Sequence, residues 1–283
     1  MNEVLEEIVR EHAPEAGTLA LSFIKFNTAG SPTRSNPKVL FFVFVGNGRE
    51  PRFVIKTVRA ARDNAVIAHG FRNLQDLARI NVALFSHPLW AGEVDGIAYS
   101  IETAVPGVRA TAGDIDRIVA AYIGFAKSTA KNSVPKDSRT CAEELLSELK
   151  LSSEEHSAFG DMLKRLGTTP EVMLLPQHGD LTQDNVLVSS KAVAFVDTDW
   201  YMPQGIAGFD MFHLLKRSDA KGDIAGYLRA YREAIGMERA FGEADLFLWY
   251  LQERVLKQRQ GSPRSTEEPL AGFERLRAQF PFA

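Results

Sequence analysis

The sequence has few residues that could cross-link it. Its 283 residues include one cysteine, Cys141, so no disulfide can form within the chain. Cysteine and histidine clusters at zinc-ligand spacing are also absent, which argues against a structural zinc site. Cys141 lies in an amphipathic helical pattern, where a small buried apolar role is expected. The chain is therefore expected to depend on a packed core.

Long apolar runs are absent as well. The longest, residues 39–45 (VLFFVFV), is much shorter than the roughly 20 residues of a membrane-spanning helix. The acidic residues 1–7 (MNEVLEE) lack the basic and apolar blocks of a secretory signal. These two features predict a cytoplasmic protein with no membrane partner.

Neither sign of charge dominates the chain. Its 33 Lys and Arg and 36 Asp and Glu give a formal net charge of −3, which offers no electrostatic reason to expect a nucleic acid or an anionic membrane as partner. Internal repeats, low-complexity tracts and nucleic-acid motifs are also absent. With 45% hydrophobic and 24% charged residues, the composition excludes disordered and fibrous classes and suits a globular protein with a sizeable core.

One stretch does carry a chemical pattern. Residues 178–185 (HGDLTQDN) place Asp180 five positions before Asn185. Two short apolar runs follow, separated by a Ser-Ser-Lys turn, and the second ends at Asp197. The pattern predicts a loop and then a β-hairpin. Because Asn185 and Asp197 both lie at the open end of that hairpin, we expect them to be close together.

These three side chains suit phosphoryl transfer. An amide oxygen and a carboxylate at one place can hold a hard cation, and Mg²⁺ prefers few protein oxygens together with phosphate oxygens and water. Asp180, in the same loop, would accept a proton from an attacking hydroxyl. A base, a metal-binding amide and a metal-binding carboxylate are the groups that this chemistry needs. The alternative is a chance His-Gly-Asp turn between two strands.

Asp180, Asn185 and Asp197 match the kinase pattern of a catalytic-loop aspartate, a metal-binding asparagine and a second metal-binding aspartate. The His-Gly-Asp start, and a helix start at residues 209–215 (FDMFHLL), resemble the aminoglycoside phosphotransferase and choline kinase superfamily. The resemblance is specific over about residues 175–215. It implies an α+β, two-lobed protein-kinase-like fold. We expect a small β-rich N-lobe over residues 1–104 and a larger, mostly helical C-lobe over 105–283, which would hold the catalytic loop and acceptor pocket.

The N-terminal part has patterns that suit such an N-lobe. Two β-rich runs joined by a Gly/Ser/Thr/Asn-rich loop predict a hairpin, and its tip could cover phosphates with backbone N–H groups. Gly30 and Ser31 are the candidates for that contact, although any hairpin loop uses such residues. The next run ends in Lys56, and the resemblance implies that this lysine binds the α- and β-phosphates. A solvated edge lysine is the alternative.

The resemblance also implies where a nucleotide base would bind. An apolar strand over residues 96–101 would lead into the hinge between the lobes. There the backbone of Glu102 and Ala104 would form hydrogen bonds with the edge of an adenine or guanine.

One position departs from the family pattern. Residues 65–80 predict an amphipathic helix, on which kinases carry a glutamate that holds the lysine. Aligning the apolar positions of this helix puts Gly70 where that glutamate is expected. Asp63 and Asp76 are substitutes, but neither falls at the natural position. The departure motivates an alternative function, a non-catalytic nucleotide-binding pseudokinase or regulatory protein on the same fold.

Two residues around the central stretch are expected to support it. The resemblance implies a structural role for His178 beside the metal-bearing strand, with a general base as the alternative. It also implies that Asp210 braces the backbone of the catalytic loop, which is compatible with capping its own helix. Asp199 either contacts substrate or is an ordinary loop residue. Asp184 either binds metal or faces solvent.

The prediction is an ATP- or GTP-dependent and Mg²⁺-dependent phosphotransferase. It would move the γ-phosphate to a hydroxyl of a small molecule of the aminoglycoside, amino-alcohol or sugar type. Asp180 would orient and deprotonate the acceptor, while Asn185 and Asp197 would carry Mg²⁺ and Lys56 would hold the phosphates. Catalysis would rest chiefly on positioning and charge neutralisation. The sequence does not choose among the acceptors, between the nucleotides or among oligomeric states.

Overall fold

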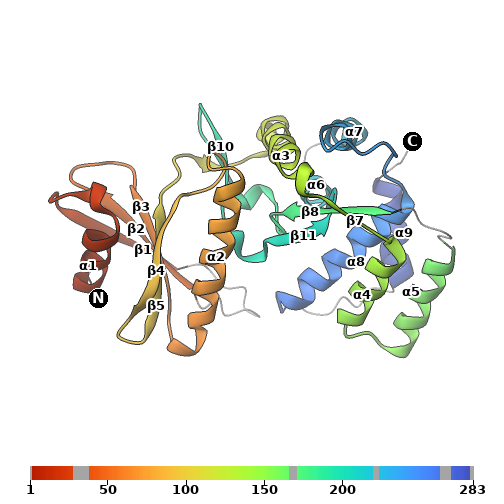
Figure 1. The fold of residues 1–283 in the computed structure, drawn as a ribbon, viewed down its shortest axis with the longest axis horizontal. Coiled ribbons are helices and arrows are strands. Elements are labelled where there is room, and N and C mark those ends of the chain that lie inside the picture. The colour runs from red at the N-terminus through yellow and green to blue at the C-terminus, as the bar shows by residue number, and fades with distance from the viewer. Residues whose placement is uncertain (1, 28–37, 166–170, 219–222, 262–268, 281–283) are drawn as a thin grey trace. The chain divides into compact units, whose positions relative to one another are not determined.

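The computed structural model describes residues 2–27, 38–165, 171–218, 223–261 and 269–280 (Figure 1). The chain divides into two compact units. Unit 1 comprises Met1–Ala110 and Asp184–Asp199, and unit 2 comprises Thr111–Gln183 and Trp200–Ala283. The segment 184–199 thus packs with the N-terminal residues. The division into functional lobes at residue 104 stays a prediction.

A five-stranded antiparallel sheet forms the body of unit 1. In spatial order its strands are β1 (Leu21–Asn27), β2 (Lys38–Val45), β3 (Phe53–Val58), β5 (Ile97–Thr103) and β4 (Pro88–Val94). These strands are rich in β-branched and aromatic residues, which favour extended backbone. Side chains alternate between the two faces, so residues 39, 41 and 43 of β2 are buried on one face.

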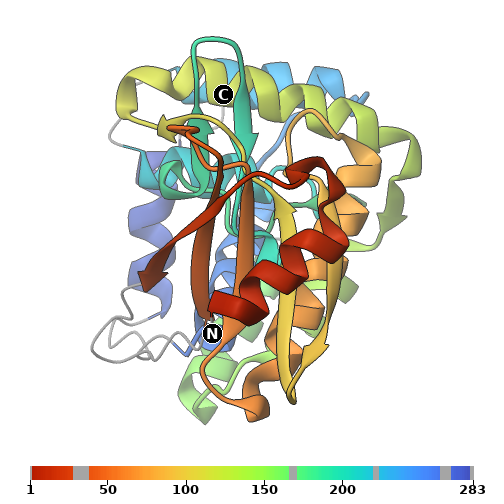
Figure 2. The ribbon, with the colours of Figure 1, turned by 90° about the vertical axis from the view of Figure 1, so that its left-hand side faces the viewer.

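Two helices cover the opposite faces of this sheet (Figures 1 and 2). α1 (Asn2–His12) lies on the apolar face, where its buried side chains join those of the strands in one core cluster. α2 (Asn64–Ile80) lies on the other face and contacts β3, β4 and β5. The sheet residues on the α2 side include polar ones. The face covered by α2 therefore carries polar side chains that a functional site can use.

A small three-stranded sheet completes unit 1. Its order is β10 (Val193–Phe195), β9 (Val186–Val188) and β6 (Val108–Arg109). β9 and β10 pair as an antiparallel hairpin, and the N–H of Val196 donates to the carbonyl of Asn185 at 2.9 Å. The predicted hairpin is thus confirmed, with Asn185 and Asp197 at its open end.

Unit 2 is mostly helical, which confirms the expected α+β class with a helical C-terminal part. Its helices are α3 (Ile115–Thr129), α4 (Ser138–Glu148), α5 (Ser153–Arg165), α6 (Phe209–Arg217), α7 (Ile224–Ala234), α8 (Glu243–Arg259) and α9 (Pro269–Gln279). A three-stranded sheet accompanies them, in the order β11 (Met202–Ile206), β8 (Val172–Gln177) and β7 (Val134–Lys136).

The core of unit 2 is centred on α8. Residues 245–253 of this helix are all buried, so it is covered on every side rather than along one stripe. Trp249 is fully buried, and its Nε1 donates to the carbonyl of Ala207 at 2.9 Å. Within the described ranges, no helix has the length and hydropathy of a membrane span.

Candidate functional site

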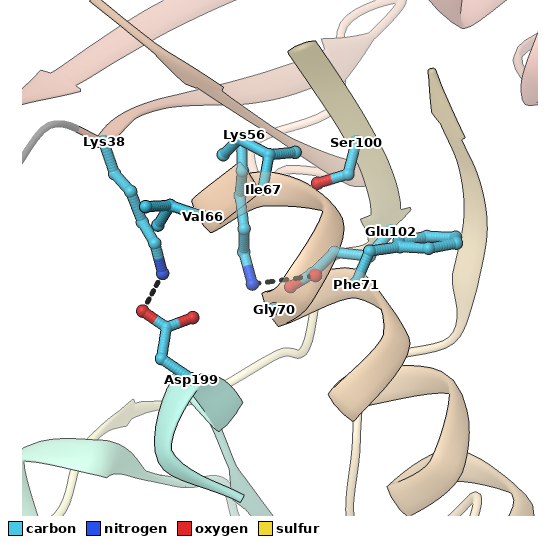
Figure 3. Close-up of a pocket in the computed structure, with 9 residues that line it drawn as sticks. All are labelled: Lys38, Lys56, Val66, Ile67, Gly70, Phe71, Ser100, Glu102 and Asp199. Atoms are coloured by element: carbon cyan, nitrogen blue, oxygen red, sulfur yellow. Dashed lines mark hydrogen bonds and ion pairs between the residues drawn. The ribbon is translucent and has the colours of Figure 1, made fainter. Parts of the chain in front are cut away.

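A small pocket lies between the polar face of the five-stranded sheet and α2, all within unit 1 (Figure 3). It has space for about one water molecule. Its walls come from β2, β3, β5, α2 and the segment that follows β10. The lining residues are Lys38, Lys56, Val66, Ile67, Gly70, Phe71, Ser100, Glu102 and Asp199. The pocket therefore brings together two lysines and two carboxylates.

Lys56 is held by a carboxylate of the neighbouring strand. In the β3–β5 ladder Lys56 lies opposite Ser100, and Glu102 is two residues further along the same face. The Nζ of Lys56 lies 2.8 Å from Oε2 of Glu102, with the two side chains 21% and 10% exposed. The acid that the sequence analysis sought on α2 is therefore on β5. The register of β3 against β5 is the signal that would have found it.

This pairing gives the side chain of Glu102 a contact besides the backbone contact predicted for residues 102–104. Glu102 lies in an inner strand of the sheet, opposite Val54 and Pro88. Its side chain reaches the pocket. The N–H of Ala104 donates to the carbonyl of Arg52 at 2.8 Å, so it is engaged within unit 1. The edge of a nucleotide base at Ala104 would therefore have to form its hydrogen bond with the carbonyl of Ala104. With this restriction, the hinge contact stays a prediction.

Lys38 is a second lysine in the pocket and was not among the predicted site residues. Leu40 lies opposite Lys56 in the β2–β3 ladder, so Lys38, two residues before Leu40, shares its face. Its Nζ contacts Oδ2 of Asp199 and lies 3.9 Å from Oδ1 of Asp197. Burial lowers the pKa of Lys38 to about 8, against the raising effect of the Asp197 carboxylate.

The segment that carries Asp197 is held in an uncommon conformation. Asp197 has a φ of 60°, in the left-handed region that few residues other than glycine adopt. The side chain of Asn73 on α2 donates to the carbonyls of Thr198 and Asp199, at 3.0 and 3.1 Å. Such outliers persist where the surroundings fix them, and they cluster at functional sites. The side chain of Asp197 is 53% exposed.

The oxygen donors beside this hairpin suit Mg²⁺. Asn185 offers an amide oxygen and Asp197 a carboxylate, and Mg²⁺ commonly binds one or two such groups and keeps several waters. In the part of the chain that the structure describes, no cluster of three or more His, Cys, Asp or Glu side chains is able to hold a metal ion. Asp184 is 75% exposed and pairs with Arg109 at 3.4 Å, so it faces solvent.

The loop that carries Asp180 belongs to unit 2, where Asp210 binds its backbone. The buried carboxylate of Asp210, on the first turn of α6, accepts hydrogen bonds from the N–H groups of His178 and Gly179, at 2.5 and 2.9 Å. Burial raises the pKa of Asp210 to about 7, against the lowering effect of these bonds. Gly179 has a φ of 88°, and an added Cβ would lie 1.8 Å from the carbonyl oxygen of Trp200. Glycine is therefore required there.

Gln260 and His213 lie close to Asp180 in the part of unit 2 that the structure describes. The Nε2 of Gln260 lies 3.3 Å from its Oδ2, and the Nδ1 of His213 lies 3.7 Å from its Oδ1. Burial lowers the pKa of His213 to about 3, and Arg217 adds to this, so the imidazole is neutral at pH 7. No role was predicted for His213 or Gln260. The only available signal for His213 was its place in the stretch FDMFHLL.

Two predicted residues cannot be placed. Gly30 and Ser31 lie outside the described residues, so their contact with phosphates stays a prediction.

The other predicted residues divide between the two units. Lys56, Asn185 and Asp197 belong to unit 1, whereas Asp180 belongs to unit 2. His178, also in unit 2, is fully buried.

Comparison with protein-family models and with curated protein sequences gives no match. Solved structures do match over nearly the whole chain. A putative fructosamine-3-kinase from Haemophilus somnus 129PT is 10% identical, covers 97% of this chain and 96% of its own, and has a TM-score of 0.59. A thermostable mutant of aminoglycoside phosphotransferase APH(4)-Ia, in a ternary complex with AMP-PNP and hygromycin B, is 12% identical, covers 96% of both chains and has a TM-score of 0.58.

A third match has the same fold. It is a GDP complex of a mutant of aminoglycoside 2'-phosphotransferase IIIa, 13% identical, which covers 97% of both chains with a TM-score of 0.56. At such low identity the likeness concerns the fold. The chain has the kinase-like fold of aminoglycoside phosphotransferases and a fructosamine kinase, as the motif resemblance predicts.

Proposed function

We propose that the protein is a phosphotransferase that moves the γ-phosphate of ATP or GTP to a hydroxyl of a small molecule, with Mg²⁺. One observation carries the proposal. On a fold shared with small-molecule phosphotransferases, the chain keeps Asp180, Asn185 and Asp197 in order and spacing, and its Lys56 is held by a carboxylate. These are the parts that a kinase-like mechanism uses.

In this mechanism unit 1 binds the nucleotide. Lys56, positioned by Glu102, would bind the α- and β-phosphates, and Gly30 and Ser31 would cover them with backbone N–H groups. Asn185 and Asp197 would hold Mg²⁺, which when bound neutralises charge on the phosphates. The complexes of fold neighbours with GDP and with AMP-PNP support a nucleotide as co-substrate.

Unit 2 would bind and activate the acceptor. Asp180 would orient the acceptor hydroxyl and take its proton at a carboxylate oxygen as the hydroxyl oxygen attacks the γ-phosphorus. The bond from the γ-phosphorus to the β–γ bridging oxygen would break, and ADP or GDP would leave. Asp210 and the buried His178 would brace the loop, because the Asp210 carboxylate accepts the N–H groups of His178 and Gly179. The hygromycin B complex of one neighbour supports an acceptor of the aminoglycoside class, and amino-alcohols and sugars remain alternatives.

The pairing of Lys56 bears on the non-catalytic alternative. That alternative rests on Gly70, which leaves α2 without the expected glutamate. Glu102 lies 2.8 Å from Lys56 and supplies a carboxylate from another element. The pairing therefore favours a catalytic protein over a pseudokinase.

The proposal is tested by calorimetric titration with ATP and with GTP, each with and without Mg²⁺. We expect one of the two nucleotides to bind more tightly with Mg²⁺. The Asp197→Ala variant should bind this nucleotide no more tightly with Mg²⁺ than without it. Its affinity without Mg²⁺ should equal that of wild type. No binding of either nucleotide at millimolar concentration would contradict the proposal.

A further inference from the structure

Helix α6 meets the loop that carries Asp180 through two of its side chains. Asp210, in the first turn of the helix, accepts the backbone N–H groups of His178 and Gly179. His213 is three positions further along α6, on the same face of the helix. Its Nδ1 lies 3.7 Å from Oδ1 of Asp180. One face of α6 therefore contacts both the backbone of this loop and the side chain of its acid.

The imidazole of His213 is fully buried, and neither of its nitrogens has a hydrogen-bond partner among the residues that the structure describes. Buried polar groups are nearly always hydrogen-bonded, and each exception calls for an explanation. Packing does not explain this one. The ring stacks on Phe209, with 5.6 Å between the ring centroids, but an apolar side chain could fill the same place without two unpaired nitrogens. A role for the nitrogens is therefore to be sought beside the ring, where Asp180 lies.

The nitrogen of His213 that lies near the carboxylate is Nδ1. A neutral imidazole carries its proton on one nitrogen only, and the neighbouring groups decide which one. The negative charge of Asp180 favours the proton on Nδ1. The separation of 3.7 Å is too long for a hydrogen bond. Catalytic hydrogen bonds are, however, often long in free enzymes and shorten when the substrates bind.

The surroundings of His213 keep this donor neutral. Burial lowers its pKa to about 3, and the positive charge of Arg217 adds to this effect. The charged groups of α6 and α8 that act on the ring are Lys216, Arg217, Glu253 and Lys257. A neutral donor fixes a carboxylate with a smaller loss of basicity than a cation would cause, which suits a general base.

The other oxygen of Asp180 also lies beside a neutral donor. The Nε2 of Gln260, directly after α8, is 3.3 Å from Oδ2 of Asp180. His213 and Gln260 therefore lie at different oxygens of the same carboxylate. A donor at each oxygen fixes the rotation of a carboxylate about its Cβ–Cγ bond.

We propose that His213 is a positioning residue for Asp180. In the enzyme with its substrates bound, Nδ1–H of His213 donates to Oδ1 of Asp180, while the amide of Gln260 donates to Oδ2. The two donors hold the carboxylate in the orientation in which it takes the proton of the acceptor hydroxyl. This inference rests on the proposed function, because it takes Asp180 to be the base.

The first test determines which nitrogen of His213 carries the proton, and it needs neither an acceptor nor turnover. The histidine rings are labelled with the heavy nitrogen isotope, and their NMR shifts are recorded near pH 7 with and without Mg²⁺ and AMP-PNP. Among the six histidines, the signal of His213 is the one that is missing from His213→Asn. It is also expected not to titrate between about pH 7 and 5.

We expect the proton on Nδ1 in wild type, and a larger share of it on Nε2 in Asp180→Ala, where the carboxylate is gone. Because His213 stays in place in both proteins, this comparison does not depend on whether its variants fold. A proton on Nε2 in wild type would overturn the inference. The same share on Nδ1 in Asp180→Ala would also overturn it, because Asp180 would then not be the partner.

The second test measures kcat and KM with the hydroxyl compound that wild type phosphorylates best, or with water if only the nucleotide is hydrolysed. His213→Leu has no donor, whereas the amide nitrogen of His213→Asn takes the place of Nδ1 and that of His213→Gln takes the place of Nε2. We expect His213→Leu and His213→Gln to lower kcat about tenfold to a hundredfold, with the KM of the nucleotide within about twofold of wild type. His213→Asn should stay within about threefold of the wild-type kcat.

The control for the kinetic test is His156→Leu, at an exposed position on α5, which should leave kcat unchanged. If His213→Asn loses as much kcat as His213→Leu and His213→Gln, the role of His213 is structural. The inference then fails while the proposed function stands. If wild type neither transfers phosphate to any compound nor hydrolyses the nucleotide, the proposed function fails, and the positioning role fails with it.

Discussion

At the scale of single residues, His213 is the most informative side chain outside the predicted set. It is fully buried beside Asp180, and neither ring nitrogen has a hydrogen-bond partner among the residues that the structure describes. Its pKa is lowered to about 3, from an unfolded value near 6.5. Below pH 6.5 the unfolded chain therefore takes up a proton that the folded chain does not.

This difference predicts a pH-dependent stability. The contribution of His213 to the free energy of unfolding is fully present above pH 6.5. It falls by about 1.4 kcal/mol per pH unit as the pH drops towards 3. His213→Leu should flatten the dependence of the free energy of unfolding on pH between about pH 6 and 4.5, measured by urea denaturation. The exposed His156 gives the matched control, His156→Leu. If the free energy of unfolding depends on pH as steeply in His213→Leu as in wild type, the lowered pKa of His213 is contradicted.

Glu253 is a second buried group with a measurable consequence. Burial by itself would raise its pKa, but Lys216 and Lys257, which both pair with it, outweigh burial and lower the pKa to about 2. Because the folded pKa is depressed, this contribution is present above the unfolded pKa of about 4.3 and is lost as the pH falls towards 2. Glu253→Gln should lower the free energy of unfolding by about 3 kcal/mol at pH 7.

The Glu253 prediction is checked by repeating the denaturation of both proteins near pH 3. The difference between wild type and Glu253→Gln should shrink there, because at pH 3 the carboxylate of Glu253 takes up a proton in the unfolded chain but stays mostly charged in the folded one. A difference that stays constant between pH 7 and pH 3 would contradict an electrostatic origin.

At the scale of elements, α2 holds the segment that carries Asp197. The side chain of Asn73 binds two carbonyls of residues 198–199, so Asn73→Ala leaves these carbonyls without their donor. We expect a loss of about 1–3 kcal/mol in the free energy of unfolding. The Mg²⁺-dependent gain in nucleotide affinity should also shrink, because Asp197 is no longer fixed. Arg72→Ala, at the exposed neighbouring position, is the control. A stability loss with an unchanged Mg²⁺ effect would limit Asn73 to a structural role.

Most elements could be predicted from sequence because their patterns are long. The apolar stripe of α2 and the β-rich run of β2 each span enough residues to fix the type of element. β6 has two residues, and β7 and β11 contain proline, so they show no usable alternation. The side-chain role of Glu102 was not predictable for another reason. Its partnership with Lys56 follows from the register between β3 and β5, which hydrophobic pattern alone does not give.

At the scale of the whole molecule, the fold was predictable from a short stretch. The polar residues between 178 and 210 resemble the motifs of a known kinase-like family, which implies that fold, and solved structures with the fold match nearly the whole chain. The second lysine pair was not predictable, because Lys38 and Asp199 are 161 positions apart and meet only in the folded unit. The chain passes between the two units on either side of residues 184–199. The groups proposed for the nucleotide are in unit 1, and the group proposed for the acceptor is in unit 2.

The most direct test of the central claim is Asp180→Asn, which keeps the size of the side chain and removes its basicity. Nucleotide affinity, measured by calorimetry with Mg²⁺, and phosphate transfer, measured over a panel of hydroxyl acceptors together with slow ATP hydrolysis, should be compared with wild type. The account predicts affinity within about twofold of wild type and turnover lower by about 10²–10⁴-fold. Turnover near the wild-type rate would contradict the role of Asp180 as the base.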